Sequence, residues 1–330
     1  MAGVGRKEQP QSSPDITALD LRTDNHHATA IESGEDVTTQ SRSESREETI
    51  TARVSRGRGR RPNYREGSRQ KAEAAVRLQV SKDTLKALPA ILDAAKDRSL
   101  RQSDKFKHED FSALQTDRSS YPDFLNTQVK VVNKDTLDTA LALDTAGDIM
   151  ETKDRGPVCV LNFANAFTRG GGWLKGSRAQ EEQICYRSSL IESLHARFYP
   201  MQPKEFIYSS EVIIFRENEA KGYSWMWTEK PDILPIVSVI SLAAKQDPPL
   251  DETEKKYENP SQRIIMESHM RTILRVAAEN LHRRLVLGAL GVLREKEFKG
   301  WFETIVFAVL DWPKGVNFPT FRDALHNLQI

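Results

Sequence analysis

Nearly continuous apolar runs constrain the fold of this chain more than any other feature of its sequence. They occur at Val158–Leu161, Leu285–Leu290 and Thr304–Val309. Runs of this length and composition are typical of strands that are buried on both faces. Apolar residues at helical spacing separate them, most clearly over Ser261–His282. Strands that alternate with helices predict an α/β fold, with a largely parallel sheet that helices cover on both faces.

Weaker signals complete this outline. We expect, in chain order, a helix from about Ser68, a loop over residues 100–122, a strand at Val129–Asn133, a helix through Leu137–Leu143, a helix from Gln180 to Phe198, and strands at Glu205–Phe215 and Leu234–Leu242. The 330 residues of the chain are enough to enclose a hydrophobic core.

The first 66 residues differ in composition from the remainder. They contain neither Phe nor Trp and are rich in Ser, Thr, Glu, Asp, Arg and Gly. Such a segment buries too little apolar surface to offset the entropy lost on ordering, so we expect residues 1–66 to be a disordered tail. The basic run Arg53–Pro62 within it is compatible with a nuclear localisation signal or a weak nucleic-acid contact, and equally with a solvated tail.

The overall charge and the cysteines exclude several classes of protein. A formal net charge of +1 excludes a generally basic nucleic-acid-binding protein. Cys159 and Cys185 are the two cysteines, and their apolar surroundings predict buried reduced thiols rather than a disulfide or a metal pair. No apolar run approaches the ~20 residues needed to cross a bilayer, and the polar N-terminus is unlike a secretory signal. We therefore expect an intracellular protein, nuclear or cytoplasmic, that does not contact a membrane.

Three consecutive glycines form the first part of a candidate site. Gly170, Gly171 and Gly172 are followed, after seven residues, by Gln-Glu-Glu. Glycine has no Cβ, so this backbone can lie against a bulky anion, and its successive N–H groups can form a concave anion site that suits a diphosphate. Flexible loops also use glycines freely, and the dinucleotide fingerprint G-x-G-x-x-G is missing.

The glutamate pair begins the next predicted helix as Gln180-Glu181-Glu182. The helix dipole favours glutamate at this position, so the pair alone would indicate only a helix start. Beside a candidate phosphate site it has a second interpretation. Adjacent helical residues point about 100° apart, so one carboxylate can face a ligand while the other packs alongside. Burial and a neighbouring carboxylate raise the pKa of a carboxyl group, as a proton donor near neutrality requires.

Two asparagines, Asn162 and Asn165, directly follow the strand Val158–Leu161. Ligands of open α/β sheets bind beyond the carboxyl ends of the strands, and an Asn amide can both donate to and accept from ribose hydroxyls. Asn also ends strands and forms turns. Without the glycines that follow, this second interpretation would be preferred.

Together these residues resemble a known family. Asn162–Asn165, Gly170–Trp173 and Ala179–Glu182 are similar to the signature of the microbial-type poly(ADP-ribose) glycohydrolases, in which Gly-Gly-Gly is followed six to eight residues later by Gln-Glu-Glu. The resemblance covers residues 68–330 and is closest to the fungal branch. It implies a three-layer α/β/α macrodomain-like fold, with a mixed sheet and an N-terminal helical extension.

The resemblance also implies roles for the site residues. Glu182 would be the catalytic acid/base, which protonates the oxygen leaving the ribose–ribose bond and then activates water. Glu181 would hold the ribose hydroxyls. The expected substrate-binding residues are Asn162, Asn165, Gly170, Gly171, Gly172 and Gln180. No metal or cofactor is expected, and the substrate would be poly(ADP-ribose) or an ADP-ribosylated protein.

The sequence departs from the family pattern at two places. Arg169 stands where the family commonly has Pro. After Gly291 the family continues with a second phosphate loop, Gly-Cys-Gly-x-Phe, and a helix, whereas here Val292–Phe298 follows at once. A genuine loss and a missed coding segment would both produce this sequence. Without that loop half of the diphosphate cradle is missing, so we expect local disorder or a displaced helix, weaker ligand affinity and lower stability.

The predicted organisation is a tail at residues 1–66, a helical accessory segment at 67–125 and a macrodomain-like catalytic domain at 126–330. The main hypothesis is a monomeric hydrolase of poly(ADP-ribose). The break after Gly291 motivates an alternative, a catalytically impaired ADP-ribose-binding module. A third and weaker hypothesis is nucleic-acid binding through Arg53–Arg61.

Overall fold

The computed structural model describes most of the chain beyond residue 63. The described residues are 64–95, 101–147, 156–226, 234–244, 249, 258–289, 296–310 and 317–325. The chain divides into two units, one of residues 1–23 and 73–330 and one of residues 24–72. Of the second unit, only the beginning of helix α1 (Tyr64–Ala94) is described, so the basic run of the predicted tail lies outside the described residues.

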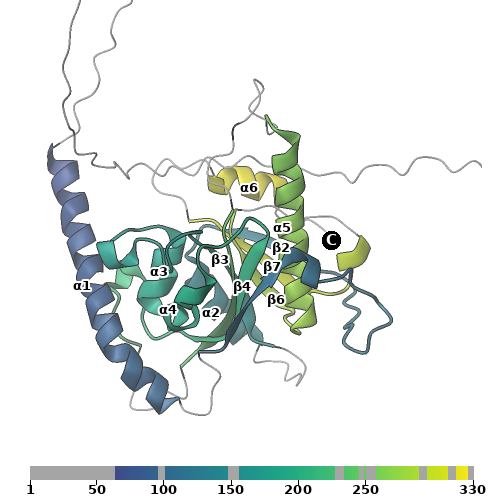
Figure 1. Ribbon diagram of the computed structural model, residues 1–330, viewed down its shortest axis with the longest axis horizontal. Coiled ribbons are helices and arrows are strands. Elements are labelled where there is room, and N and C mark those ends of the chain that lie inside the picture. The colour runs from purple at the N-terminus through teal and green to yellow at the C-terminus, as the bar shows by residue number, and fades with distance from the viewer. Residues whose placement is uncertain are drawn as a thin grey trace, which may run out of the picture. The chain divides into compact units, whose positions relative to one another are not determined.

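A seven-stranded mixed sheet forms the centre of the first unit (Figure 1). Its strands are β1 (Ser103–Lys107), β2 (Gln128–Val132), β3 (Val158–Phe163), β4 (Glu205–Ile213), β5 (Ile236–Leu242), β6 (Arg284–Leu287) and β7 (Thr304–Ala308). Their order across the sheet is β1-β4-β5-β3-β6-β7-β2. The five strands from β5 to β2 run parallel, whereas β4 and β1 join antiparallel at one edge. The mixed sheet confirms the expected fold class.

Helices cover the two faces of this sheet. Besides α1 they are α2 (Thr136–Gly147), α3 (Gln180–Arg187), α4 (Leu190–Ser193), α5 (Pro260–Glu279) and α6 (Asn317–Leu325). Successive residues of β3 enter opposite cores, because side chains alternate along a strand. Val158 and Val160 pack with α1 to α4, while Cys159 and Leu161 pack with α5 and α6. The three layers that result are visible in Figure 1.

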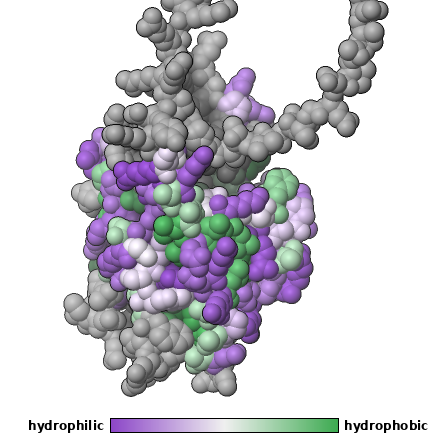
Figure 2. All heavy atoms as spheres, turned by 90° about the vertical axis from the view of Figure 1, so that its left-hand side faces the viewer, coloured by the Kyte–Doolittle hydropathy of each residue, from purple (hydrophilic) through white to green (hydrophobic). Residues whose placement is uncertain are grey.

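The surface on the α1 side is mixed in character. Figure 2 shows hydrophobic areas there, interrupted by hydrophilic side chains. On α1 itself, Val76 and Leu85 are exposed. Among the described helices, none has the length and hydropathy that a membrane span requires. Both cysteines are free and buried, as predicted.

Two of the predicted elements are wrong. The predicted loop over residues 100–122 contains β1, an edge strand whose polar side chains carry no period-2 signal and whose pairing comes from the backbone of β4. The predicted helix from Gln180 to Phe198 breaks at Ser188, whose extended backbone forms a bridge to Ile214. The Ser189 hydroxyl accepts a hydrogen bond from the Ile213 N–H group, which holds the break against β4.

The connection from β6 to its parallel neighbour β7 is the segment in which the sequence departs from the family. It comprises residues 288–303. Its described part contains a short 3-10 helix, Lys296–Phe298. Residues 290–295, with Gly291 and the predicted gap, lie outside the described residues. A parallel crossover usually needs a dozen or more residues, so this connection is near the lower limit.

Candidate active site

The first turn of α3 packs against the end of β3 through Gln180. Its Oε1 accepts a hydrogen bond from the Phe163 N–H group at 2.8 Å. Its Nε2 donates to the Leu161 carbonyl at 2.7 Å and to the Thr136 hydroxyl at 3.2 Å. One side chain therefore joins the start of α3 to the last residues of β3 and to the start of α2. Both polar atoms of the Gln180 side chain are occupied within the chain, and its predicted contact with a substrate stays a prediction.

Both glutamates are buried, with relative exposures of 3% for Glu181 and 7% for Glu182. Glu181 Oε2 accepts a hydrogen bond from the Asn165 N–H group at 2.8 Å, and Glu182 Oε1 accepts one from the Gly172 N–H group at 2.7 Å. Hydrogen bonds to charged acceptors are roughly twice as strong as neutral ones. The loop between β3 and α3 thus folds back onto the two carboxylates that follow it.

The glycines allow this close approach. Gly171 has a φ of +56°, and a Cβ added there would lie 2.5 Å from Glu182 Oε1 and 3.0 Å from Glu181 Oε2. A Cβ on Gly172 would lie 2.1 Å from the Ser177 hydroxyl oxygen. A side chain at position 171 would therefore collide with the glutamates, and one at position 172 would collide with Ser177.

The N–H groups of the glycine turn are used within the chain. Gly171 donates to the Thr168 carbonyl at 3.0 Å, and Gly172 donates to Glu182. The turn therefore differs from a free anion nest, in which successive N–H groups point toward a ligand. Gly171 and Gly172 are half-buried, so part of the turn is accessible from outside. Contact of this turn with a diphosphate stays a prediction.

The two asparagines have different surroundings. Asn162 is fully buried, and its Nδ2 donates to the Ser241 hydroxyl of β5 at 3.0 Å. Asn165 is exposed, and its Oδ1 accepts from the N–H groups of Phe167 and Thr168 at 2.8 and 2.9 Å. The Asn165 side chain therefore forms a turn, which was the simpler interpretation of its position. Asn162 lies beneath the surface of the site.

Three buried oxygen atoms at this place have no hydrogen-bond partner among the described residues. They are Glu181 Oε1, Glu182 Oε2 and Asn162 Oδ1. An unpaired buried acceptor costs about 1–3 kcal/mol, more when it is charged, so such atoms are rare in folded proteins and each calls for an explanation. All three atoms lack a donor, so a ligand that satisfied them would bring hydroxyl or N–H groups.

Burial, followed by the charge of Glu182, raises the pKa of Glu181 to about 7. The N–H groups of Asn165 and Gly170 and the Asn162 side chain act in the opposite direction, because they stabilise the ionised carboxylate. Near neutrality, then, Glu181 holds a proton for part of the time.

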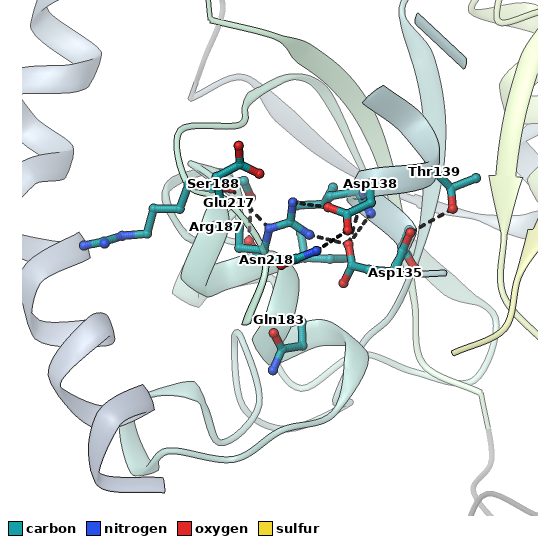
Figure 3. A network of polar contacts seen from close by, with 12 residues as sticks. Asp135, Asp138, Thr139, Gln183, Arg187, Ser188, Glu217 and Asn218 are labelled. Carbon is teal, nitrogen blue, oxygen red and sulfur yellow. Dashed lines mark hydrogen bonds and ion pairs between the residues drawn. The ribbon is translucent and has the colours of Figure 1, made fainter. Parts of the chain in front are cut away.

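A buried ion-pair network that sequence reasoning missed holds the other end of α3. The Arg187 guanidinium, which has no exposed surface, pairs with Asp135 and, at 2.6 Å, with Asp138 (Figure 3). Asn218 donates to the second oxygen of Asp138 at 2.5 Å. Asp135 also caps α2, accepting from the Leu137 N–H group at 2.8 Å. An Asp before a helix is a readable capping signal, but nothing local indicates that its partner is Arg187.

Helix α1 holds the far end of the glycine loop. The buried Arg77 donates to the Gly176 carbonyl at 2.8 Å and pairs with Glu219 at the same distance. Gly176 has a φ of +79°, and a Cβ there would lie 2.4 Å from the Ala74 carbonyl oxygen. The helix backbone and the loop therefore touch directly. In the described part of the chain no cluster of three or more His, Cys, Asp or Glu could hold a metal ion.

Comparison with known protein families identifies a catalytic-domain family. The family model for the microbial-type PARG catalytic domain matches residues 36–217, more than half of the chain. The matched range includes the three glycines and the two glutamates of the site. No curated protein sequence matches the chain significantly.

Several solved structures share the fold. The poly(ADP-ribose) glycohydrolase (PARG) from Thermomonospora curvata is 24% identical, with a TM-score of 0.57 over 74% of this chain and 97% of that one. The same enzyme has been solved with the inhibitor ADP-HPD, with equal identity and TM-score over 75% and 98% of the two chains. The PARG from Deinococcus radiodurans in complex with ADP-ribose is 26% identical, with a TM-score of 0.51 over 68% and 95%. The chain belongs to the microbial-type PARG catalytic domain family and is a glycosidase-type hydrolase.

Proposed function

We propose that this protein hydrolyses the ribose–ribose O-glycosidic bonds of poly(ADP-ribose), with Glu182 as the acid/base. The observation that carries this proposal is the set of buried oxygens without partners on Glu181 and Glu182. A ribose presents hydroxyl donors on adjacent carbons, and the unpaired carboxylate oxygens of two successive residues are suitable acceptors for them. That the related Deinococcus radiodurans protein was solved in complex with ADP-ribose supports the same class of ligand.

The reaction would proceed through one carboxyl group that acts twice. Protonated Glu182 donates its proton to the glycosidic oxygen as the bond from this oxygen to the anomeric carbon breaks, which leaves an oxocarbenium-like ribose. The carboxylate then accepts a proton from a water molecule, whose oxygen bonds to the anomeric carbon. Glu182 ends protonated, as it began. Glu181 accepts hydrogen bonds from the ribose hydroxyls and orients the sugar.

The Gly172 N–H group has a defined part in this scheme. Its hydrogen bond to Glu182 Oε1 leaves Oε2 as the oxygen that carries the exchanged proton. The same bond fixes the direction of the carboxyl plane, so the proton is presented in one orientation. We propose, further, that the diphosphate lies over the accessible side of Gly171 and Gly172.

A second candidate function is ADP-ribose binding with impaired catalysis. The short connection between β6 and β7 favours it, because residues 288–303 leave little chain for a second phosphate loop. A substrate held only from the β3 side would bind more weakly and turn over more slowly.

The test is release of ADP-ribose from automodified poly(ADP-ribose) by wild type, Glu182→Gln and a control, Glu267→Gln. Glu267 forms an exposed i,i+4 ion pair with Arg263 on α5, so its loss leaves the site unchanged. General acid–base catalysis contributes about 10²- to 10⁴-fold, and we expect Glu182→Gln to lose activity by that factor while the control keeps it.

Calorimetry with ADP-ribose separates the two candidate functions. Binding together with Glu182-dependent turnover supports the hydrolase. Binding by a wild-type protein that releases no product supports the impaired module. Equal turnover by wild type and Glu182→Gln would reject the proposed role of Glu182.

A further inference from the structure

A buried tyrosine of α3 contacts the glycine loop from the same helix face as Glu182. Tyr186 has no exposed surface, and it lies one turn after Glu182 on this helix. Side chains at this spacing lie on the same face of an α-helix, one above the other. Both side chains form hydrogen bonds with the loop between β3 and α3. The helix therefore holds this loop with a carboxylate and with a phenol hydroxyl.

The Tyr186 hydroxyl lies between two carbonyl groups of the loop. Its oxygen is 2.9 Å from the Trp173 carbonyl oxygen and 2.9 Å from the Ser177 carbonyl oxygen. A carbonyl oxygen can only accept, so the hydroxyl is the donor in both contacts and shares its one proton between them. Burial raises the pKa of Tyr186 well above its usual range, so the hydroxyl keeps this proton. One side chain thus joins two separate points of the loop.

Backbone hydrogen bonds continue from these carbonyl groups to the catalytic carboxylate. The Gly172 carbonyl accepts from the Ser177 N–H group at 3.2 Å, which closes a turn over residues 172–177. The Gly172 N–H group donates to Glu182 Oε1 at 2.7 Å. The turn is therefore held by α3 at both ends, by Glu182 at its first residue and by Tyr186 at its last.

We infer that Tyr186 is a positioning residue, whose hydroxyl holds the turn of residues 172–177 so that the Gly172 N–H group meets Glu182 in one orientation. The inference rests on the proposed function, because this orientation matters for turnover only if Glu182 is the acid/base. Without the hydroxyl, two carbonyl groups lose their shared donor, and the turn moves to find other partners. The Glu182 carboxyl group then presents its proton in more than one direction, which slows the reaction.

The test compares Tyr186→Phe with a matched control, Tyr223→Phe. Both variants remove one phenol hydroxyl from a buried side chain, and both keep the aromatic rings, whose centroids lie 5.6 Å apart. The Tyr223 hydroxyl donates to Gln183 Oε1 at 2.9 Å, so the control loses a hydrogen bond to a side chain of α3 that lies outside the turn. A general weakening of α3 would therefore affect both variants.

The two variants should differ in turnover. We expect Tyr186→Phe to lower kcat about tenfold, since misplacing a catalytic group costs up to about a hundredfold, and Tyr223→Phe to lower it less than about twofold. A Tyr186→Phe enzyme with the kcat of wild type would overturn the inference. A Tyr186→Phe protein that failed to fold would overturn it as well, because the hydroxyl would then support the whole core rather than one turn.

Amide hydrogen exchange keeps this inference separate from the proposed function. NMR follows the exchange of the Gly172 amide whether or not the protein turns over substrate. Losing one hydrogen bond of ordinary net strength shifts a local opening equilibrium about tenfold, so this amide should exchange about tenfold faster in Tyr186→Phe. The amides of β3 should keep their wild-type rates.

Faster exchange at Gly172 in Tyr186→Phe, with the wild-type rate in Tyr223→Phe, supports the inference even if the wild-type protein releases no product. An unchanged rate at Gly172 in Tyr186→Phe, or equal acceleration in the two variants, would overturn it.

Discussion

Two connections leave the carboxyl ends of neighbouring strands β3 and β6, and they differ in what they hold. The loop after β3 supplies the hydrogen bonds to the two glutamate side chains, from the N–H groups of Asn165 and Gly172. The connection after β6 is anchored elsewhere. There, Glu297 pairs with Arg275 of α5 at 2.6 Å.

The first residue after β6 lies against the last residue of β3, since a Cβ on Gly288 would lie 2.2 Å from the Phe163 ring. The comparison teaches that the carboxylates are assembled by one connection alone. We therefore expect a short second connection to lower ligand affinity while it leaves the two carboxylates in place.

The largest expected effect on stability is the loss caused by replacing Arg187, compared with the loss caused by replacing Arg275. Arg187→Met leaves the buried charges of Asp135 and Asp138 without their partner, so it should lower the free energy of unfolding by about 3–5 kcal/mol. Arg275→Met breaks a pair that keeps about a fifth of its surface exposed and should cost about 1 kcal/mol. Urea denaturation at pH 7 measures both. Equal losses would show that the two connections are equally anchored.

Two glycine substitutions test whether the glycine turn positions the glutamates. Gly171→Ala introduces both a left-handed non-glycine residue and a Cβ 2.5 Å from Glu182 Oε1. Gly222→Ala has the same backbone strain, at a φ of +64°, but meets nothing within 4 Å. Strain costs about 1–3 kcal/mol at either position. Only Gly171→Ala should also lower turnover, by about a hundredfold. Similar turnover in the two variants would remove the proposed role of the turn.

The smallest expected effect concerns the pH dependence of stability. The pKa of Glu181 rises from 4.5 to about 7 on folding, so the folded state binds more protons in this window and stability falls as the pH rises through it. Glu181→Gln removes this loss and should be about 3 kcal/mol more stable than wild type at pH 8, but close to it at pH 4.5. Thermal denaturation at the two pH values measures the difference.

Buried histidines act in the opposite direction and provide an internal control. Burial lowers the pKa of His108 and of His282 to about 4, so their contribution to stability is lost as the pH falls from 6.5 toward 4. Both proteins carry these residues, so the acid-side loss should be the same in wild type and in Glu181→Gln. A variant that gains nothing at pH 8 would contradict the raised pKa of Glu181.

The local sequence pattern was enough to predict those parts of the fold that depend on residues close together in the sequence. The apolar run at Val158–Leu161 becomes the central strand β3, because only a strand buried on both faces has such a composition. The nearness of the Gln-Glu-Glu turn to the end of β3 was also predictable. A helix that returns along a parallel strand must begin beside the carboxyl end of that strand.

What could not be predicted depends on contacts between distant parts of the chain. The Gly172 N–H group bonds to a glutamate because of the direction in which that side chain points. The spacing of residues along the sequence does not encode this direction. The edge strand β1 exists because β4 offers a free edge. Arg187 and Ser241 bond to partners 52 and 79 residues away in the chain, so these contacts appear only once the sheet is assembled.

The most direct test is a structure of the wild-type protein with ADP-ribose, which is the expected product and is not consumed. The account predicts ribose hydroxyl oxygens within hydrogen-bond distance of Glu181 Oε1 and Glu182 Oε2, with the anomeric carbon next to Glu182. ADP-ribose bound elsewhere, with both carboxylate oxygens still lacking a donor, would contradict it.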